Sequence, residues 1–451
     1  MSFNTSNRVL VLDKNKAPLM PCHPARAREL LNDGKAAVYR RYPFTIILKD
    51  RAGGDTQHID IKIDPGTKYT GMALVGWFKR GPRCIYGLHI KHRGDVVRQA
   101  MAQRAASRRA RRSRNLRYRP ARFNNRTRSP EWVPPSIKSR VSNVMTWVRR
   151  LLSTASTDKV YFEVVKFDTD AMANVTRAQY DTDARIRTQM RHYLLTTRGN
   201  VCSYCKGVSE NTRLEREHVI PRSRGGTDAL ANAELACRQC NLDKGTMLLS
   251  EWLNALKGRT DPLSIARLKH IPKCVSRTRH SLRDASIMNW TRYVIVDRIR
   301  DLGIEVIERP AWETAHHRHV GRYAKTHWVD AACIGYVPYL DDQSTIYTAV
   351  ASGYGTRQMI KSDRYGFPRG RPKGPSRVHG YRTGDMCRLN QPGGKYKGVY
   401  VGRITIRVSG QFDIRHLKSK IGSKYTNYVL LQNNDGYMYT TGTGTLSIII
   451  K

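Results

Sequence analysis

Two pairs of cysteines with C-x-x-C spacing constrain the fold of this chain more than any other feature. Cys202 and Cys205 form the first pair, and Cys237 and Cys240 form the second. Four thiolates spaced in this way can close a tetrahedral cage around zinc, which braces a fold too small to stabilise itself. The odd total of nine cysteines favours metal binding in a reduced, intracellular protein over a disulfide framework. The cage itself does no chemistry, so a purely structural zinc ribbon remains as one alternative. A coincidental arrangement of reduced thiols is the other.

The segment between the two pairs distinguishes these alternatives. Glu217 and His218 are adjacent, a Gly-Gly pair and Asn232 follow, and Asn241 comes directly after the last cysteine. A histidine has the near-neutral pKa that a general base needs to deprotonate water. In this order the residues of 200–247 resemble the HNH (ββα-metal) endonuclease finger. The stretch LEREHVIPRSRGG is therefore expected to be a catalytic loop.

The resemblance implies a role for each residue of this module. His218 would be the general base. Glu217 and Asn241 would bind one Mg²⁺ ion through oxygen, and Asn232 would hold the loop that presents the histidine. The family often has aspartate before the histidine, whereas Glu217 keeps the charge but lengthens the reach. The structural zinc ion would be bound by Cys202, Cys205, Cys237 and Cys240.

A second set of acidic residues is spread over the chain. In HIDIKIDPG, isoleucines alternate with polar residues and predict a half-buried strand that ends at Asp64, before a Pro-Gly turn. KVYFEVVKF predicts a strand with Glu163, and THWVDAACIGYV predicts a helix with His327 and Asp330 on one face. Taken singly, these residues are typical of a turn, a sheet edge and an exposed helix face. Their order resembles the three-part RuvC nuclease, which has an RNase H-like fold.

The RuvC resemblance implies a second metal centre. Asp64, Glu163, His327 and Asp330 would gather around two Mg²⁺ ions, one of which activates water while the other stabilises the leaving oxygen. Clustered carboxylates repel one another unless cations lie among them, which is a physical reason for metal at such a site.

The arginines indicate a polyanionic partner. The formal net charge is +44, from 80 Lys+Arg and 36 Asp+Glu, and nucleic acid is the partner that would neutralise it. Residues 98–128 contain 12 arginines and no acidic residue. Residues 98–119 lack proline and glycine, so we expect a helix ordered by RNA, with a disordered basic arm as the alternative. The arginines expected to contact RNA are Arg104, Arg108, Arg109, Arg111, Arg112 and Arg114.

The arrangement of these parts resembles one family along essentially the whole chain. The HNH module interrupts the RuvC elements, and the arginine-rich segment follows the first of them, as in the transposon-encoded IscB nucleases, compact relatives of type II CRISPR effectors. KNKAPLMPCHPARARELL resembles the PLMP domain of that family, and TGDMCRLNQPGGKYKGVYVGRITIRVSGQFDI resembles its C-terminal region.

The resemblance implies an α/β multidomain fold. It comprises an RNase H-like RuvC core in three segments, an arginine-rich bridge helix, an inserted zinc-braced ββα-metal HNH domain and a small C-terminal β-barrel-like domain. The expected boundaries, in chain order, are 1–55 (PLMP), 56–95 (RuvC I), 96–130 (bridge helix), 131–197 (RuvC II), 198–260 (HNH), 261–355 (RuvC III) and 356–451 (C-terminal domain).

The implied function is RNA-guided, metal-dependent DNA cleavage. A long structured guide RNA would pair with target double-stranded DNA, the HNH site would cut the paired strand and the RuvC site the displaced strand, and the C-terminal domain would inspect a flanking motif. The absence of an apolar run of about 18 residues or a signal-peptide pattern predicts no membrane span. We expect a monomeric ribonucleoprotein in the prokaryotic cytoplasm, associated with the nucleoid.

Two alternatives use the same residues differently. An autonomous HNH homing or restriction-type endonuclease would need its own base-reading module, and the sequence has no clear helix-turn-helix or extra finger. An RNA-binding protein without cleavage would leave the complete acidic set unexplained.

Overall fold

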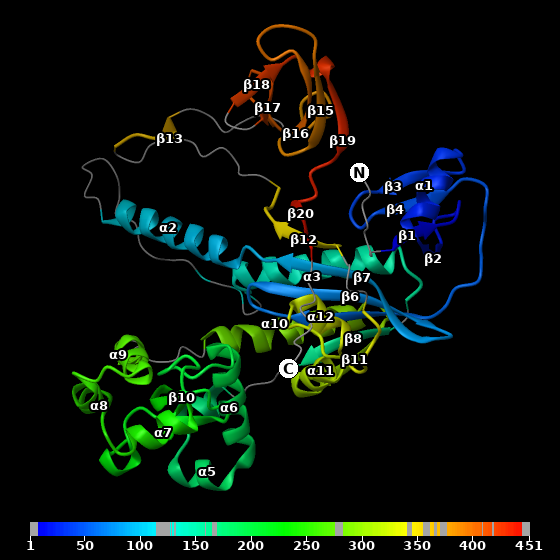
Figure 1. Ribbon diagram of the computed structural model, residues 1–451. Helices are drawn as coiled ribbons and strands as arrows, with labels where there is room; N and C mark the ends of the chain where they lie inside the picture. The colour runs from blue at the N-terminus through cyan, green and yellow to red at the C-terminus, as the bar shows by residue number, and fades with distance from the viewer. Residues whose placement is uncertain are drawn as a thin grey trace. The chain divides into compact units, whose positions relative to one another are not determined.

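The computed structural model divides the chain into two compact units (Figure 1). Unit 1 consists of Met1–Val164 and Thr291–Lys451, and unit 2 is Val165–Trp290, which is inserted between the two parts of unit 1 in the sequence. Within the described residues, no helix combines the length and apolar character needed to cross a membrane. The structure describes residues 8–113, 127, 129, 132–157, 159–164, 169–275, 283–340, 345–354, 361–364, 368–369, 377–407, 409–416 and 419–443.

A seven-stranded sheet forms the centre of unit 1. Three consecutive strands make an antiparallel meander in its middle, two later strands add in parallel on one side, and two more complete the other side. In spatial order the strands are β11 (Glu305–Pro310), β8 (Lys159–Val164), β5 (Ile59–Pro65), β6 (Tyr69–Phe78), β7 (Gly81–Lys91), β12 (Thr345–Ala351) and β20 (Tyr437–Thr443).

Strand β5 is buried on both faces, whereas the alternation of its residues predicted a half-buried strand. Ile61 and Ile63 are fully buried, and so is Lys62 between them. The face that carries Lys62 is covered by α12 (His327–Ala332), because the Lys62 ammonium reaches the carbonyl of Ala332. The sequence pattern identified the strand but could not reveal a covering helix located so much later in the chain.

Helix α12 lies very close to the sheet, and a glycine makes this approach possible. A Cβ atom at Gly71 of β6 would lie 1.8 Å from the carbonyl oxygen of His327. The helix was expected to continue through THWVDAACIGYV, but it ends at Ala332. Helix α12 therefore ends two residues after Asp330.

Four further helices belong wholly or partly to unit 1. The predicted arginine-rich helix is α2, which ends at Arg112, and residues 114–119 of the expected helix lie outside the described residues. The segment with His316 and His319 is helical. The bounds are α2 (Gly94–Arg112), α3 (Pro135–Leu152), α10 (Arg283–Arg300, which begins in unit 2) and α11 (Ala311–Val320).

The N-terminal strands and helix form as the sequence predicted. A proline begins the helix, and the Nδ1 atom of His23 accepts a hydrogen bond from the backbone N–H of Ala25, so the helix start is capped. The four-stranded sheet has the order β2 (Pro18–Cys22), β1 (Val9–Leu12), β4 (Thr45–Leu48) and β3 (Ala36–Arg40), with α1 (Pro24–Asn32) between β2 and β3 in sequence.

In the described residues, unit 2 contains a short antiparallel pair of strands, six α-helices and two 3₁₀ turns, besides the beginning of α10. Three successive helices precede the strands, because Thr176 forms a capping box at the start of the second and Asp183 caps the third. The strands are β9 (Leu214–His218) and β10 (Ala233–Cys237). The α-helices are α4 (Thr169–Asn174), α5 (Arg177–Thr182), α6 (Ala184–Arg198), α7 (Arg238–Lys244), α8 (Leu249–Leu256) and α9 (Pro262–Val275), with 3₁₀ turns η1 (Arg222–Arg224) and η2 (Leu230–Asn232).

Within the described residues, the C-terminal segment contributes to three sheets of unit 1. Five strands form an antiparallel sheet around a core that includes Phe412, Leu389 and Ile404. In contrast β20, also within the expected 356–451 domain, pairs with β12 of the central sheet. The strand expected over TLSIIIK lies outside the described residues. The five strands are, in order, β18 (Ser419–Ser423), β17 (Phe412–His416), β16 (Gly398–Ile406), β15 (Met386–Gln391) and β19 (Tyr428–Gln432), and β13 (Lys361–Ser362) pairs with β14 (Pro368–Arg369).

Candidate functional site

The three separated acidic residues of unit 1 meet at one place on the central sheet. Asp64 lies near the end of β5, Glu163 lies near the end of β8, and these strands are parallel neighbours. Asp330 on α12 completes the group, and all three carboxylates are buried. Segments far apart in sequence are thus brought together because the chain returns to the same sheet after the insertion of unit 2.

The electrostatics of this acidic cluster favour a cation. Burial, and then the carboxylates of Asp64 and Asp330, raise the pKa of Glu163 to about 8. Burial and the Asp64 carboxylate also raise the pKa of Asp330. Like charges held in a buried site disfavour ionisation, and hard divalent cations with oxygen ligands relieve that repulsion. The donor set therefore fits Mg²⁺.

His327 is part of the same cluster. Its Nδ1 atom lies 3.3 Å from Oδ2 of Asp64, and its ring stacks on Tyr69 at a centroid distance of 5.5 Å. The hydrogen bond to Asp64 raises the pKa of His327. Burial and neighbouring His327 lower the pKa of His89 to about 4. The four residues predicted for this centre are therefore neighbours.

Two arginines at the cluster were missed by the sequence reasoning. Arg318 of α11 forms an ion pair with Asp330. Arg292 of α10 donates from Nη2 to the carbonyl of Pro65 at 3.3 Å, and it interacts electrostatically with Glu163 and Asp64. Neither arginine belongs to a motif, and only the packing of α10 and α11 brings them to the carboxylates.

Lys62 is a further residue that the sequence did not single out. Its ammonium donates to the carbonyls of Ala332 and Ile334 at 3.0 and 2.7 Å, and lies 3.1 Å from the ring centroid of Tyr336. Burial lowers the pKa of Lys62 to about 7. A cation at the end of a helix interacts favourably with its last carbonyls. Lys62 therefore anchors α12, which carries Asp330.

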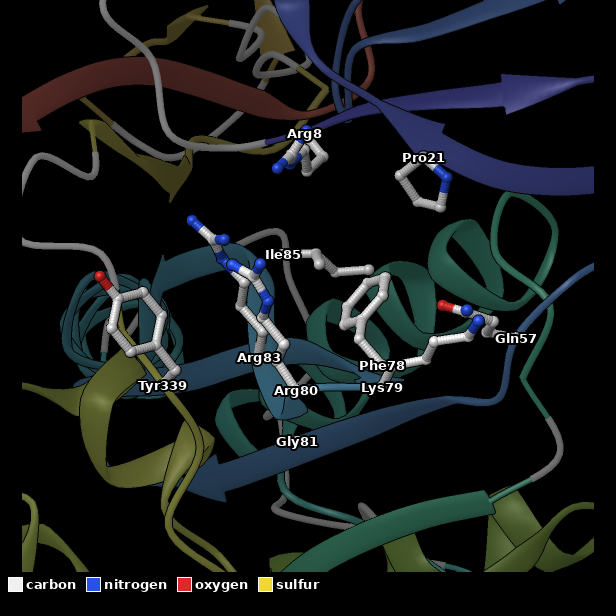
Figure 2. Close-up of a pocket in the computed structure, with 10 residues that line it drawn as sticks. All are labelled: Arg8, Pro21, Gln57, Phe78, Lys79, Arg80, Gly81, Arg83, Ile85 and Tyr339. Carbon is white, nitrogen blue, oxygen red and sulfur yellow. The ribbon is translucent and has the colours of Figure 1, made fainter.

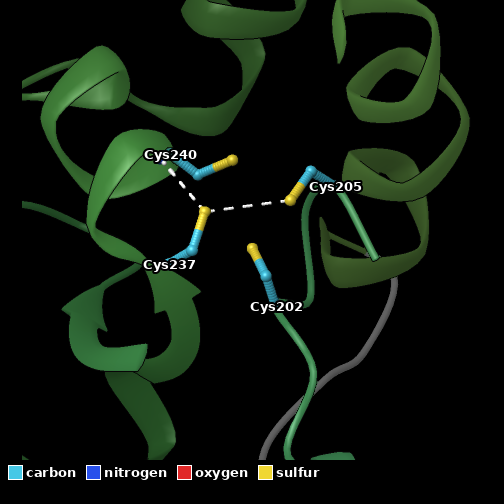
Figure 3. A group of neighbouring side chains, drawn as sticks. All are labelled: Cys202, Cys205, Cys237 and Cys240. Atoms are coloured by element: carbon cyan, nitrogen blue, oxygen red, sulfur yellow. Dashed lines mark hydrogen bonds between the residues drawn. The ribbon is translucent and has the colours of Figure 1, made fainter. Parts of the chain in front are cut away.

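The four paired cysteines form a second centre, in unit 2. Their sulfur atoms all lie within 4.8 Å of one another, and Figure 3 shows the side chains converging. Sγ of Cys205 lies 3.8 Å from Sγ of Cys237. Zinc–sulfur bonds of about 2.3 Å in a tetrahedron require a sulfur separation of about 3.8 Å. The cluster therefore fits a structural zinc ion, as the sequence predicted.

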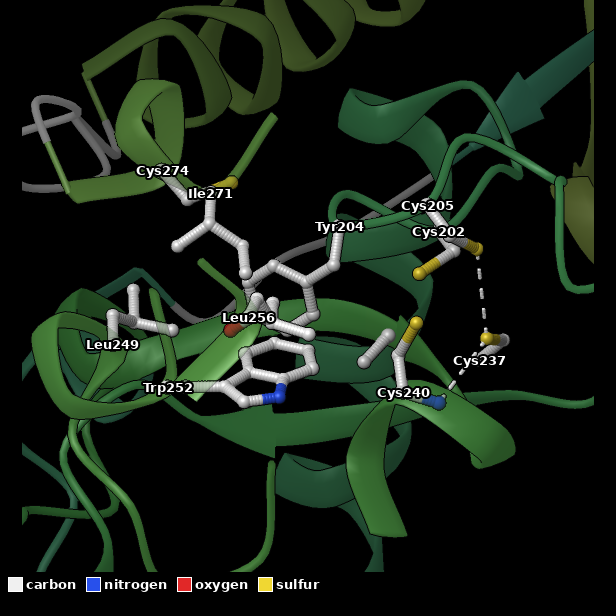
Figure 4. Packing of buried hydrophobic residues seen from close by; sticks show 11 residues of the cluster. Cys202, Tyr204, Cys205, Cys237, Cys240, Leu249, Trp252, Leu256, Ile271 and Cys274 are labelled. Carbon is white, nitrogen blue, oxygen red and sulfur yellow. Dashed lines mark hydrogen bonds between the residues drawn. The ribbon is translucent and has the colours of Figure 1, made fainter. Parts of the chain in front are cut away.

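The surroundings of the cysteines support this fit. Nε of Arg267 donates to Sγ of Cys240 at 3.3 Å, which favours a thiolate. An apolar cluster continues from the cysteines to α8 and α9, and Figure 4 shows Tyr204 and Trp252 in its centre. Their rings pack edge to face at 5.3 Å. The cysteine cage and this small core thus stabilise the same module.

His218 ends β9 and has a carboxylate partner. Its Nε2 atom lies 2.8 Å from Oδ1 of Asp228, and Nη2 of Arg222 lies 2.7 Å from the same oxygen. Burial is the main reason that the pKa of His218 is lowered. The imidazole is therefore largely neutral at neutral pH, as a general base requires. Asp228 was missed because a single aspartate after Gly-Gly carries no distinctive signal.

Asn232 holds the loop after His218 in the way the sequence suggested. Its Oδ1 accepts from the backbone N–H of Ile220 at 2.8 Å, and its Nδ2 donates to the carbonyls of Ile220 and Thr227 at 2.9 and 2.8 Å. A Cβ atom at Gly226 would lie 1.8 Å from the Ile220 carbonyl oxygen. The glycine and the asparagine together fix this turn.

The expected pair of Glu217 and Asn241 is not brought together. Asn241 instead donates to Oε2 of Glu215 at 3.0 Å. Glu217 accepts from Nζ of Lys244 at 2.6 Å and from the hydroxyl of Tyr204 at 2.5 Å. Glu215 and Glu217 lie on the same face of β9, because alternate residues of a strand share a face. Helix α7 packs against that face, so that Asn241 lies beside Glu215 and Lys244, one helical turn later, lies beside Glu217. In this arrangement Glu215 is the carboxylate beside Asn241.

The arginines of α2 differ in exposure. Arg104 and Arg109 are exposed, while Arg108 and Arg112 are half-buried. The side chain of Arg111 and all of Arg114 lie outside the described residues. The helix thus presents cations to solvent along part of its surface, which suits contacts to phosphates.

Two family models match the chain. The RRXRR protein family matches residues 9–183, and residues 108–112 read Arg-Arg-Ala-Arg-Arg. The HNH endonuclease family matches residues 202–257, which include both cysteine pairs and His218. A search of curated proteins finds no match.

Solved structures with similarity include two Cas9 enzymes. Cas9 of Streptococcus thermophilus in complex with the GGAA PAM is 13% identical, with a TM-score of 0.22, and the match covers 61% of this chain and 32% of that one. The Type II-C Cas9 enzyme from Actinomyces naeslundii is 16% identical, with a TM-score of 0.15, and the match covers 46% and 29%. The matches thus span about a third of those proteins. The chain thus combines a region similar to the RRXRR protein family with a region similar to the HNH endonuclease family.

Proposed function

We propose that this protein is an RNA-guided DNA endonuclease with two metal-dependent centres. The observation that carries the proposal is the insertion of unit 2, with its HNH match, between the strand of Glu163 and the helix of Asp330. Both ends of that insertion continue into the one unit that holds Asp64, Glu163 and Asp330. Two candidate nuclease centres in one chain suit the cutting of two DNA strands.

The strand order of unit 1 supports an RNase H-like assignment for its centre. The run β7-β6-β5-β8-β11 consists of an antiparallel meander followed by two strands parallel to β5. Asp64 on the first strand of the meander and Glu163 on its parallel neighbour match the order that the RuvC resemblance implies. We therefore assign this sheet to the RuvC segments of the chain.

At the acidic cluster, Asp64, Glu163 and Asp330 would hold two Mg²⁺ ions, which supply water activation and stabilisation of the leaving oxygen. His327, whose Nδ1 atom is beside Asp64, is placed to accept or return a proton at the edge of the cluster. Arg318 already pairs with Asp330, so it orients this carboxylate and contributes positive charge where a phosphate would lie.

At the second centre, His218 accepts the proton of the attacking water. Because Nε2 is engaged by Asp228, Nδ1 is the ring atom left to act as the base. One Mg²⁺ would be held by Asn241 together with a carboxylate of β9, Glu217 by family resemblance or Glu215 by its position beside Asn241, and it would stabilise the charged phosphate. Zinc in the cysteine cage would hold the module together.

The partners follow from charge and family resemblance. A chain of net charge +44 with exposed arginines on α2 is suited to a long structured guide RNA and to target DNA. We assign the guide-paired strand to the HNH centre, the displaced strand to the acidic centre, and inspection of a flanking motif to the C-terminal sheet. The complex is proposed to be a monomeric ribonucleoprotein in the cytoplasm of a prokaryote, associated with the nucleoid.

The first experiment is to express the protein with its native genomic flanks, purify it at high salt and sequence the RNA that remains bound. One dominant structured RNA with a variable, guide-like end is expected. A heterogeneous mixture would overturn RNA guidance and favour an endonuclease that finds DNA by itself.

The guide obtained in this way then allows strand-specific cleavage assays with end-labelled DNA. Asp64→Ala is expected to abolish cutting of the displaced strand alone, and His218→Ala cutting of the paired strand alone. If the double variant still cuts both strands, both assignments are wrong.

A further inference from the structure

A basic cleft of about 720 Å³ lies in unit 1. Figure 2 shows Arg8 and Pro21 on one side of the cleft and Phe78 on the hairpin between β6 and β7 on the other. Tyr339 closes one end in this view. The volume is within the usual range of sites for small organic groups. The lining residues are Arg8, Pro21, Gln57, Phe78, Lys79, Arg80, Gly81, Arg83, Ile85 and Tyr339.

The walls of the cleft are joined by backbone hydrogen bonds. The N–H of Arg8 donates to the carbonyl of Ile85 at 2.9 Å, which attaches the N-terminal chain to β7. The N–H of Tyr339 donates to the carbonyl of Pro82 at 2.8 Å, and that of Cys84 donates to the carbonyl of Tyr339 at 3.0 Å. Three segments distant in sequence are therefore fixed around one hollow, so the cleft is preformed.

The chemistry of the lining combines positive charge with apolar and aromatic surface. Four cations line the cleft, and none of its ten described lining residues is acidic. Phe78 and Ile85 offer apolar surface, while Tyr339 is 60% exposed and carries the Arg83 guanidinium 5.1 Å from its ring centroid. Aromatic rings and arginine planes stack on nucleobases, and arginine and lysine bind phosphate. The combination suits a nucleotide better than a bare anion.

The position of the cleft on the central sheet separates it from the acidic cluster. Gly71 of β6 pairs with Asp64, and Phe78 lies at the other end of the same strand. At about 3.3 Å per residue, the two points are about 23 Å apart along the strand. A phosphodiester at Asp64 therefore cannot occupy the cleft, and the occupant belongs to a part of the nucleic acid that is held rather than cut.

We propose that this cleft binds one unpaired nucleotide of the bound RNA. The base packs against Phe78 and Ile85, Tyr339 bounds the site, and Arg8 and Arg80 contact the flanking phosphates. An unpaired nucleotide is required because the bases of a duplex stack on one another and do not offer their faces to side chains. The inference rests on the proposed function, since it assumes that the chain carries an RNA.

The direct test is photocrosslinking of the ribonucleoprotein prepared with 4-thiouridine in its RNA, followed by mass spectrometry of peptide–nucleotide adducts. We expect an adduct on Phe78 or Tyr339 and at a single unpaired position of the RNA. If RNA is bound but all adducts lie elsewhere, this inference is wrong while the proposed function stands. If no RNA is bound, the proposed function itself fails.

Variants measure the contribution of the cleft. Tyr339→Ala removes the aromatic ring that bounds the site, and it is expected to speed dissociation of the RNA about tenfold, the usual scale for loss of one aromatic contact with a base. Tyr354→Ala is the matched control, because Tyr354 is 71% exposed and does not line the cleft. Equal dissociation rates for the two variants would overturn the proposal, and thermal unfolding of the RNA-free proteins verifies that both are folded.

Charge removal and competition distinguish the possible occupants. Lys79→Gln with Arg80→Gln should reduce the slope of log affinity for the RNA against log salt by about 1, whereas exposed Lys14→Gln with Arg41→Gln should not. Adenosine monophosphate should not displace the RNA at micromolar concentration. Tight binding of the free nucleotide, or adducts with target DNA instead of RNA, would overturn the assignment.

Discussion

The acidic centre of unit 1 and the zinc-braced module of unit 2 are built in opposite ways. Asp64, Glu163 and Asp330 come from three distant segments and meet only through a common sheet. The module takes its cysteines and His218 from one contiguous stretch, and a short hairpin and helix position them. The first centre therefore depends on a large core for its geometry, whereas the second is held by a local cluster of four cysteines that fits a zinc ion.

Removal of zinc is expected to have the largest effect, because it should unfold one of the two regions and not the other. Cys202→Ser with Cys237→Ser, or a strong chelator, should unfold the cysteine-containing module of residues 200–257, because structural zinc contributes on the order of 10 kcal/mol to such modules. Unit 1 should remain folded on its own core. Limited proteolysis with mass spectrometry measures this, with cleavages expected inside 200–257 alone. Cys387→Ser is a control, since Cys387 lies in the core of the five-stranded sheet.

The second largest effect is expected on how the stability of the protein depends on pH, because the acidic centre contains a buried carboxyl group with a raised pKa. The pKa of Glu163 is raised to about 8 from 4.5. A carboxyl group whose pKa is higher in the folded than in the unfolded protein stabilises the folded state while it is protonated. The free energy of unfolding of the metal-free protein should therefore fall as the pH rises from about 4.5 to about 8. Glu163→Gln should remove a part of this dependence, on the order of a few kcal/mol. Thermal unfolding in EDTA across that range is the measurement, and identical profiles for both proteins would contradict the electrostatic account.

Lys62 provides a smaller, more local test of how the acidic centre is held. Lys62→Met leaves two buried carbonyls without their donor, and it should destabilise the protein by about 1–3 kcal/mol. Cutting of the displaced strand should fall at least tenfold, because α12 no longer holds Asp330 firmly. Lys68→Met is the matched control, since Lys68 is exposed near the same strand. Equal cutting by both variants would exclude a positioning role for Lys62.

The smallest expected effect separates the two glutamates of β9. Glu217→Gln removes the charge that faces buried Lys244 but keeps an oxygen acceptor for its ammonium, so the free energy of unfolding of the module should fall by about 1–2 kcal/mol. Glu215→Gln should leave stability nearly unchanged and raise the Mg²⁺ concentration needed for cutting the paired strand. The two variants are compared by thermal unfolding and by magnesium titration. A normal magnesium requirement in Glu215→Gln would return the metal-binding role to Glu217.

The sequence by itself determined most of the elements and the chemistry they carry. The cysteine pairs, the alternation before Asp64 and the i, i+3 spacing of His327 and Asp330 are local patterns, and local backbone geometry decides which side chains share a face. The cysteine spacing identified the four-cysteine cluster, whereas the four residues of the acidic cluster were identified by the resemblance of the order of their segments to the RuvC nucleases.

Only the tertiary structure decided which residues surround those groups. Arg318 and Lys62 contact the acidic centre through helices packed on the sheet, and Asp228 contacts His218 through a turn of the loop. The exchange of Glu217 for Glu215 beside Asn241 depends on how α7 crosses β9. Such contacts have no fixed sequence separation, because they are set by the packing of whole elements, and no periodicity in the chain encodes them.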